Sequence, residues 1–242
     1  TTVAAATYLT PAAGDTRYVQ ESESETRVTG PAPLALLHAV LASSIRQPVR
    51  LAFLGSSSTA GNNATVASQR YVNRLTAAVQ RAYPSGLEGY EAPTVALGTT
   101  PSTLPGVQGL NGGIASTFAS TYTPGGTITS LGTAQPHVVF HMIGSNDYQL
   151  GVAPATYQSA LAAAVASVDA ALTIPPLHVL VHSYRRADVV SPTYPWTDYR
   201  DAMAAVAAAH GKAVFIDVSA QAETVLMPST DSYDLLDTDH VH

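Results

Sequence analysis

The 242-residue chain is predicted to be an α/β protein with a five-stranded parallel sheet covered by helices on both faces. Three observations lead to this fold class. Short apolar runs without strict polar alternation are typical of strands buried on both faces. Longer segments with apolar residues at helical spacing separate these runs. Strands that alternate with helices favour a parallel sheet, because each crossover returns the chain to the same edge.

The elements follow in chain order from these patterns. The helices end where Gly or a Pro pair interrupts the helical spacing, as at Gly211 and Pro175-Pro176. Residues 111–135 are rich in Gly, Ser and Thr and are expected to form a loop. Helices are expected over 34–45, 64–82, 155–172 and 198–210. Strands are expected over 49–54, 137–143, 177–182 and 213–218, with both 94–97 and 107–110 as candidates for the second strand.

Residues 1–32 differ from the rest of the chain. They mix Thr, Pro, Gly and charged residues, and they show little apolar periodicity. This composition predicts an extended arm or linker that lacks a core of its own. A single domain is expected over 33–242.

Composition excludes several classes of protein. The formal charge is −6, and the 11 basic residues form no cluster, which argues against nucleic acid as a partner. No apolar run reaches the roughly 18 residues that a bilayer-spanning helix needs, so no membrane insertion is expected. The chain has no cysteine, which excludes disulfides and thiolate metal sites.

Polar turns follow the first three strands, and a short acidic and histidine-containing segment ends the chain. The turns are Gly55-Ser56-Ser57, the segment 111–117 and Gly144-Ser145-Asn146-Asp147. The final segment is Asp239-His240-Val241-His242. Open α/β sheets bind ligands beyond the carboxyl ends of their strands, where these turns lie. A serine, an amide donor, a histidine and an aspartate are the groups that acyl transfer requires.

With these four segments in this order, the sequence resembles the SGNH (GDSL-type) hydrolase family over roughly residues 48–242. The resemblance implies a flavodoxin-like fold and a serine esterase or deacetylase that needs no cofactor and no metal. It implies that Ser57 is the nucleophile, His242 the base and Asp239 the acid that orients this base. The oxyanion would be held by the Asn146 amide and by backbone N–H groups of Ser57 and of either Ser116 or Gly113.

Two departures from the family pattern stand out. Ser56 occupies the position where the family usually has aspartate. The chain also stops at the expected catalytic histidine, whereas the family continues through a proline and a further helix. Two interpretations of this end stay open: a trimmed chain or an omitted disordered tail. Asp237 and His240 repeat the Asp-x-x-His spacing and compete with Asp239 and His242 for the same role.

Each of these residues also has a simpler interpretation. The serines at 56–58 could cap the following helix, since serine is a favoured N-cap. Asn146 and Asp147 could be ordinary turn residues. The acidic and imidazole groups at the C-terminus could hold a metal ion. Four further histidines are interpreted as hydrogen-bonded core residues: His137, His141, His178 and His182.

The N-terminal segment 8–19 resembles the joining segments of bacteriophage tail fibres and tail-tip proteins. This second resemblance implies an extracellular or virion location, a homotrimer formed through the arm, and action on ester or acetyl groups of a host envelope. Small esters or acetylated glycans are the expected substrates. Two alternatives are a catalytically silent glycan-binding module and a lipase or thioesterase that acts on long acyl chains.

Overall fold

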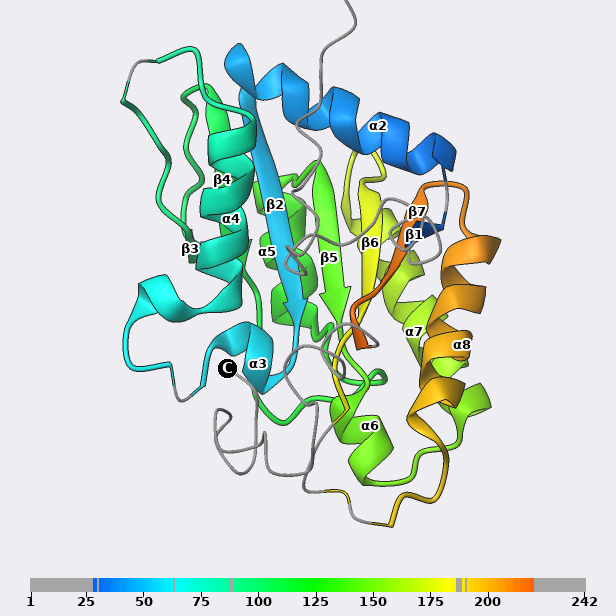
Figure 1. Cartoon of the computed structure of the whole chain (residues 1–242). Helices are drawn as coiled ribbons and strands as arrows, with labels where there is room; N and C mark the ends of the chain where they lie inside the picture. The colour runs from blue at the N-terminus through cyan, green and yellow to red at the C-terminus, as the bar shows by residue number, and fades with distance from the viewer. Residues whose placement is uncertain are drawn as a thin grey trace, which may run out of the picture.

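The fold is a sheet between two layers of helices (Figure 1). This computed structural model describes residues 28–29, 31–62, 64–87, 89–185, 189 and 191–219. The predicted α/β class, with helices on both faces of the sheet, is confirmed. In the described part of the chain, no helix is long and apolar enough to cross a bilayer.

The sheet has seven strands in the order β1-β7-β6-β5-β2-β4-β3, where five were predicted. All neighbouring strands are parallel except β1, which runs antiparallel to β7. Both candidates for the second strand form strands, and β1 comes from the segment predicted to be an arm. The edge strands β1 and β3 are each two residues long, which is too short for a strand pattern to show in the sequence. The strands are β1 (Val28–Thr29), β2 (Pro48–Gly55), β3 (Val95–Ala96), β4 (Gly106–Asn111), β5 (Val138–Met142), β6 (Leu177–His182) and β7 (Ala213–Asp217).

Helices cover both faces of the sheet. One apolar cluster joins α5, α7 and α8 to one face, and a second joins α2 and α4 to the other. The helices are α2 (Pro31–Ala42), α3 (Ser57–Ala60), α4 (Tyr71–Ala82), α5 (Gly125–Ala134), α6 (Ser145–Gln149), α7 (Pro154–Ala171) and α8 (Trp196–Ala209). Short 3₁₀ turns occur at η1 (Ser43–Ile45) and η2 (Ala67–Gln69).

Two sequence-based boundaries were wrong. The segment 111–135 is not wholly a loop, because α5 occupies its second half, where Leu131 and Ala134 are buried against the sheet. Tertiary packing here overrides the low helix propensity of a Gly- and Thr-rich segment. The helix expected from residue 64 begins only at Tyr71, after the η2 turn.

The strand register brings the three polar turns to one edge of the sheet. Gly55, the last residue of β2, is paired with Met142, the last residue of β5. Asn111, the last residue of β4, is paired with Phe53 on the other side of β2. In Figure 1 the arrows of β2 and β5 point toward the same end of the molecule, where α3 and α6 lie.

Candidate active site

Ser57 opens the short helix α3 directly beyond the buried strand β2. The turn between them requires glycine at Gly55, because a Cβ there would lie 2.2 Å from Thr59 Oγ1 and 2.4 Å from the Met142 carbonyl oxygen. The Ser56 side chain makes no capping hydrogen bond to α3, so the capping interpretation does not hold for that residue. As the first helical residue, Ser57 has a backbone N–H without an intrahelical acceptor.

The three adjacent serines have different surroundings. The Ser58 hydroxyl lies 3.1 Å from Tyr184 Oη, which ties it to the chain that follows β6. Ser56 and Ser57 are both buried, and Ser57 retains 6% exposure. Within the described residues, the Ser57 hydroxyl has no hydrogen-bond partner, which leaves its oxygen available for a reaction.

The chain after β4 runs alongside β2 and reaches α3. The Gly112 N–H donates to the Phe53 carbonyl at 2.8 Å, and the Ile114 N–H donates to the Gly55 carbonyl at 2.9 Å. Gly113 packs directly on α3, because a Cβ at this position would lie 2.2 Å from the Ala60 backbone nitrogen. Its own N–H donates to Asn111 Oδ1 at 2.9 Å. That N–H therefore already has an acceptor.

Ser116 has a left-handed backbone, with φ of 61°. This conformation is uncommon outside glycine and persists only where the surrounding structure enforces it. The enforcement comes partly from Asn146, whose Nδ2 donates to the Thr117 carbonyl at 2.8 Å. Asn146 is buried, so its amide links the turn after β5 to the loop after β4.

Asp147 anchors the same loop from inside the protein. Both of its carboxylate oxygens accept the Ala119 N–H, at 3.2 and 3.1 Å. Burial raises the pKa of Asp147 to about 6, although hydrogen bonds from backbone N–H groups act in the opposite direction. The sequence motif includes Asp147, but nothing in the motif shows that it anchors the loop.

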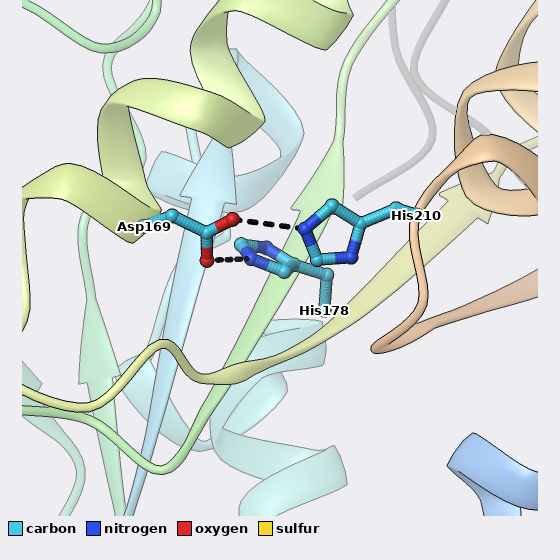
Figure 2. Close-up of side chains that lie close together, drawn as sticks. All are labelled: Asp169, His178 and His210. Carbon is cyan, nitrogen blue, oxygen red and sulfur yellow. Dashed lines mark hydrogen bonds and ion pairs between the residues drawn. The ribbon is translucent and has the colours of Figure 1, made fainter.

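The predicted base and its orienting acid, His242 and Asp239, lie outside the described residues, as do their competitors Asp237 and His240. Their roles stay predictions. At the opposite, amino edge of β6 and β7, a second cluster brings Asp169, His178 and His210 together (Figure 2).

The interpretation of the four other histidines as hydrogen-bonded core residues holds in full for two of them. His141 and His178 are fully buried and hydrogen-bonded to each other. His137 is hydrogen-bonded, because its Nδ1 accepts the Arg50 N–H at 3.2 Å, but it is only partly buried. His182 lies in the core, but the expected hydrogen bond was wrong for it. Its two ring nitrogens are buried without a hydrogen-bond partner in the described structure, while its ring stacks on Trp196 at 4.3 Å between centroids.

Two clefts lie near the carboxyl edge of the sheet. The first, of about 240 Å³, is lined by residues of α3, α4, β3 and the loop after β4, including Ala60, Arg70 and Gly113. The second, of about 310 Å³, lies beside α6 and the start of α8 and includes Tyr148, Trp196 and Arg200. A third, mostly apolar cleft of about 360 Å³ includes Leu36, His137 and Ile174, at the opposite edge.

A serine on a tight strand–helix turn, with an amide and a strained loop at the same sheet edge, is the arrangement that the sequence predicts for an ester hydrolase. The model of the GDSL-like lipase/acylhydrolase family matches residues 53–242. The chain therefore belongs to this family. No curated protein matches the sequence significantly.

Solved structures share the fold at low sequence identity. A two-domain esterase active on acetylated mannans aligns at 13% identity with a TM-score of 0.61, over 91% of this chain and 51% of that one. The present chain thus spans about half of that esterase. A peptidoglycan O-acetylesterase aligns at 12% identity with a TM-score of 0.60, over 89% and 93% of the two chains. An acetyl-xylooligosaccharide esterase variant from Geobacillus aligns at 19% identity with a TM-score of 0.57, over 82% and 88%.

Proposed function

We propose that the protein is a serine ester hydrolase in which Ser57 attacks the ester carbonyl carbon. The observation that carries this proposal is the convergence of Ser57, the strained loop at Ser116 and the Asn146 amide at one sheet edge. The family assignment and the esterases of the same fold support it.

In this mechanism His242 removes the Ser57 proton as the new bond to the carbonyl carbon forms, and Asp239 orients His242. The developing oxyanion accepts hydrogen bonds from the Asn146 amide and from the N–H groups of Ser57 and Ser116. Gly113 is the weaker candidate for that donor, because its N–H already donates to Asn111. The alcohol leaves with the proton from His242, and water then hydrolyses the acyl-enzyme with the same histidine as base.

We further propose short acyl groups, in particular O-acetyl groups on glycans, as the substrate. The cleft beside α3 is lined by polar groups that include Arg70 and Asn73. The esterases of the same fold include one active on acetylated mannans and a peptidoglycan O-acetylesterase. These observations support acetyl esters over the lipase or thioesterase alternative.

The test is hydrolysis of p-nitrophenyl acetate together with labelling by a fluorophosphonate. Ser57→Ala is expected to abolish both, whereas Ser58→Ala is the matched control and retains both. His242→Ala is expected to lose turnover and His240→Ala to keep it; the reverse result moves the role to Asp237 and His240. A wild-type protein that neither turns over nor accepts the label would support the silent glycan-binding module instead.

For the N-terminal segment, we propose an assembly arm that forms a homotrimer on a bacteriophage tail. The support is the resemblance of residues 8–19 to tail-fibre joining segments, and residues 1–27 lie outside the described structure. A chain that starts at Val28 keeps β1, so it tests the arm without removing an edge strand. It is expected to retain esterase activity and to lose oligomerisation in light scattering. An unchanged oligomeric state would remove this proposal.

A further inference from the structure

A buried chain of hydrogen bonds runs from the loop after β4 to the far edge of the sheet. Tyr122 Oη lies 2.7 Å from His141 Nδ1, and His141 Nε2 lies 2.9 Å from His178 Nδ1. His178 Nε2 lies 3.0 Å from Asp169 Oδ1. Tyr122 and the two histidines are fully buried. These four residues are called the relay: Tyr122, His141, His178 and Asp169.

The partners at the far end fix the direction of the hydrogen bonds. The Lys212 N–H donates to His210 Nδ1 at 3.2 Å, so the proton of a neutral His210 is on Nε2, which donates to Asp169 Oδ2 at 2.8 Å. An ionised Asp169 accepts from both histidines, as Figure 2 shows. His178 then donates through Nε2 and accepts through Nδ1.

The direction of the remaining hydrogen bonds, from His178 inward to the loop, follows from these partners. His141 must donate through Nε2 to His178, so its Nδ1 accepts the Tyr122 hydroxyl. Burial lowers the pKa of both His141 and His178, with the nearby imidazoles lowering that of His141 further. Both rings are therefore neutral near pH 7, the state that this direction requires. Burial alone would raise the pKa of Asp169, but the hydrogen bonds from His178 and His210 outweigh it and lower the pKa.

A metal ion at Asp169, His178 and His210 is the competing interpretation, since their ligand atoms lie within 4.8 Å of one another. The surroundings disfavour it. A neutral His210 that bound a metal through Nε2 would need its proton on Nδ1, where the Lys212 N–H points. The Lys212 charge also acts on His178 and would repel a cation.

The inner end of the relay holds the segment that the proposed mechanism uses. Tyr122 closes a turn in which its N–H donates to the Phe118 carbonyl at 3.0 Å. Ala119 in this turn donates to Asp147, and Thr117 just before it accepts from Asn146. These three anchors follow Ser116, whose left-handed backbone needs such enforcement.

We propose that the relay positions the 112–124 loop so that the Ser116 N–H is aimed at the oxyanion. This inference rests on the proposed esterase function. Tyr122 is then a positioning residue that acts through the loop and does not touch the substrate. Connected buried hydrogen bonds stiffen the elements that they join, so the relay fixes the loop from the layer formed by β5, β6 and α7.

The first experiment compares Tyr122→Phe, Asp169→Asn and the double variant. Tyr122→Phe is expected to lower kcat on p-nitrophenyl acetate about tenfold with little change in KM, as for the loss of one hydrogen bond. Asp169→Asn alters only the far end of the relay, and it is expected to lower kcat by about threefold, less than Tyr122→Phe. The double variant is expected to be no slower than Tyr122→Phe alone, because coupled residues are non-additive. Independent, multiplicative losses would overturn the relay as a unit.

The matched control is Tyr83→Phe, which removes a tyrosine hydroxyl that pairs with His38 Nδ1 on the other face of the sheet. It is expected to leave kcat and KM unchanged. An equal loss of kcat in this control would mean that the effect is a general consequence of lower stability.

Amide hydrogen exchange across 112–124 provides a readout that does not depend on activity. Exchange in this segment is expected to rise in Tyr122→Phe and in Asp169→Asn, but not in Tyr83→Phe. Unchanged exchange would overturn the positioning role, even if wild-type protein proves to be no esterase. Increased exchange with an unchanged kcat would overturn its link to catalysis. Finally, a rise in Tm with zinc that Asp169→Asn abolishes would replace the relay with a metal site.

Discussion

At the scale of single residues, Asn146 combines two tasks in one amide. One Nδ2 hydrogen holds the Thr117 carbonyl, and the proposed mechanism assigns the other to the oxyanion. Asn146→Ala is expected to lower kcat by about 10²–10³-fold with little change in KM, because an oxyanion donor stabilises the transition state more than bound substrate. Steady-state kinetics on p-nitrophenyl acetate checks this. A rise confined to KM would mean that Asn146 binds the substrate in its ground state.

His182 is a single residue whose burial affects stability. Its two ring nitrogens are buried and have no hydrogen-bond partner among the described residues. A buried polar group without a partner costs free energy, and an apolar group of the same shape avoids that cost. His182→Phe preserves the stacking on Trp196 and is expected to raise Tm by several degrees, since about 1 kcal/mol shifts Tm by about 2–4 °C in a chain of this size. Thermal unfolding at pH 7 measures it. A lower Tm would show that the imidazole has a stabilising role that the structure does not reveal.

At the scale of elements, the contact between the loop after β4 and helix α3 depends on Gly113. Any side chain at this position meets the backbone of α3 and not a movable side-chain end. Gly113→Ala is therefore expected to displace α3, and with it Ser57, and to reduce kcat/KM by at least tenfold. Gly126→Ala on α5 is the control, because a Cβ there has nothing within 4 Å. Equal activity of the two variants would contradict the close packing of loop and helix.

The elements that the sequence predicts best are those with a continuous apolar run. The buried strands β2, β5, β6 and β7 lie close to their predicted ranges, because each is an apolar run bounded by turn residues. Helices α3 and α6, of 4 and 5 residues, are too short to show helical spacing. Ser57, Asn146 and the 111–117 segment are still predicted to share one edge, because each directly follows a strand of a parallel sheet.

The finer features of the site depend on contacts between distant parts of the chain. The relay joins the loop after β4, two strands and helix α7, so no spacing in the sequence reveals it. The choice between Ser116 and Gly113 likewise depends on which N–H is already occupied, and that follows from the Asn111 side chain. The position of each strand along the chain is encoded locally, whereas hydrogen-bond partners are set by the tertiary fold.

At the scale of the whole molecule, buried ionisable groups tie stability to pH. Burial lowers the pKa of His141 and of His178, and lowers that of His182 to about 4 despite the opposing charge of Asp217. In the unfolded chain these histidines take up protons near their ordinary pKa of about 6.5. The unfolded state therefore binds more protons than the native state as the pH falls below 6.5, and stability is lost.

Asp147 acts in the opposite sense. Its carboxyl keeps a proton up to a pKa of about 6 in the native protein and up to about 3.8 in the unfolded chain, so it adds stability as the pH falls between these values. One carboxyl opposes three buried histidines, and each net proton contributes about 1.4 kcal/mol per pH unit. The histidines are therefore expected to dominate between pH 6.5 and about 4.

The free energy of unfolding is accordingly expected to be highest near pH 7 and to fall steadily from pH 6.5 to pH 5. Urea titrations at pH 7, 6 and 5 measure this, with the m-value as a check that the same surface unfolds at each pH. His182→Phe removes one proton-linked group, so its stability is expected to fall less steeply over this range, while Tyr83→Phe should retain the wild-type slope. A free energy of unfolding that stays flat or rises between pH 7 and pH 5 would contradict this expectation. It would show that protonation of Asp147 outweighs that of the histidines.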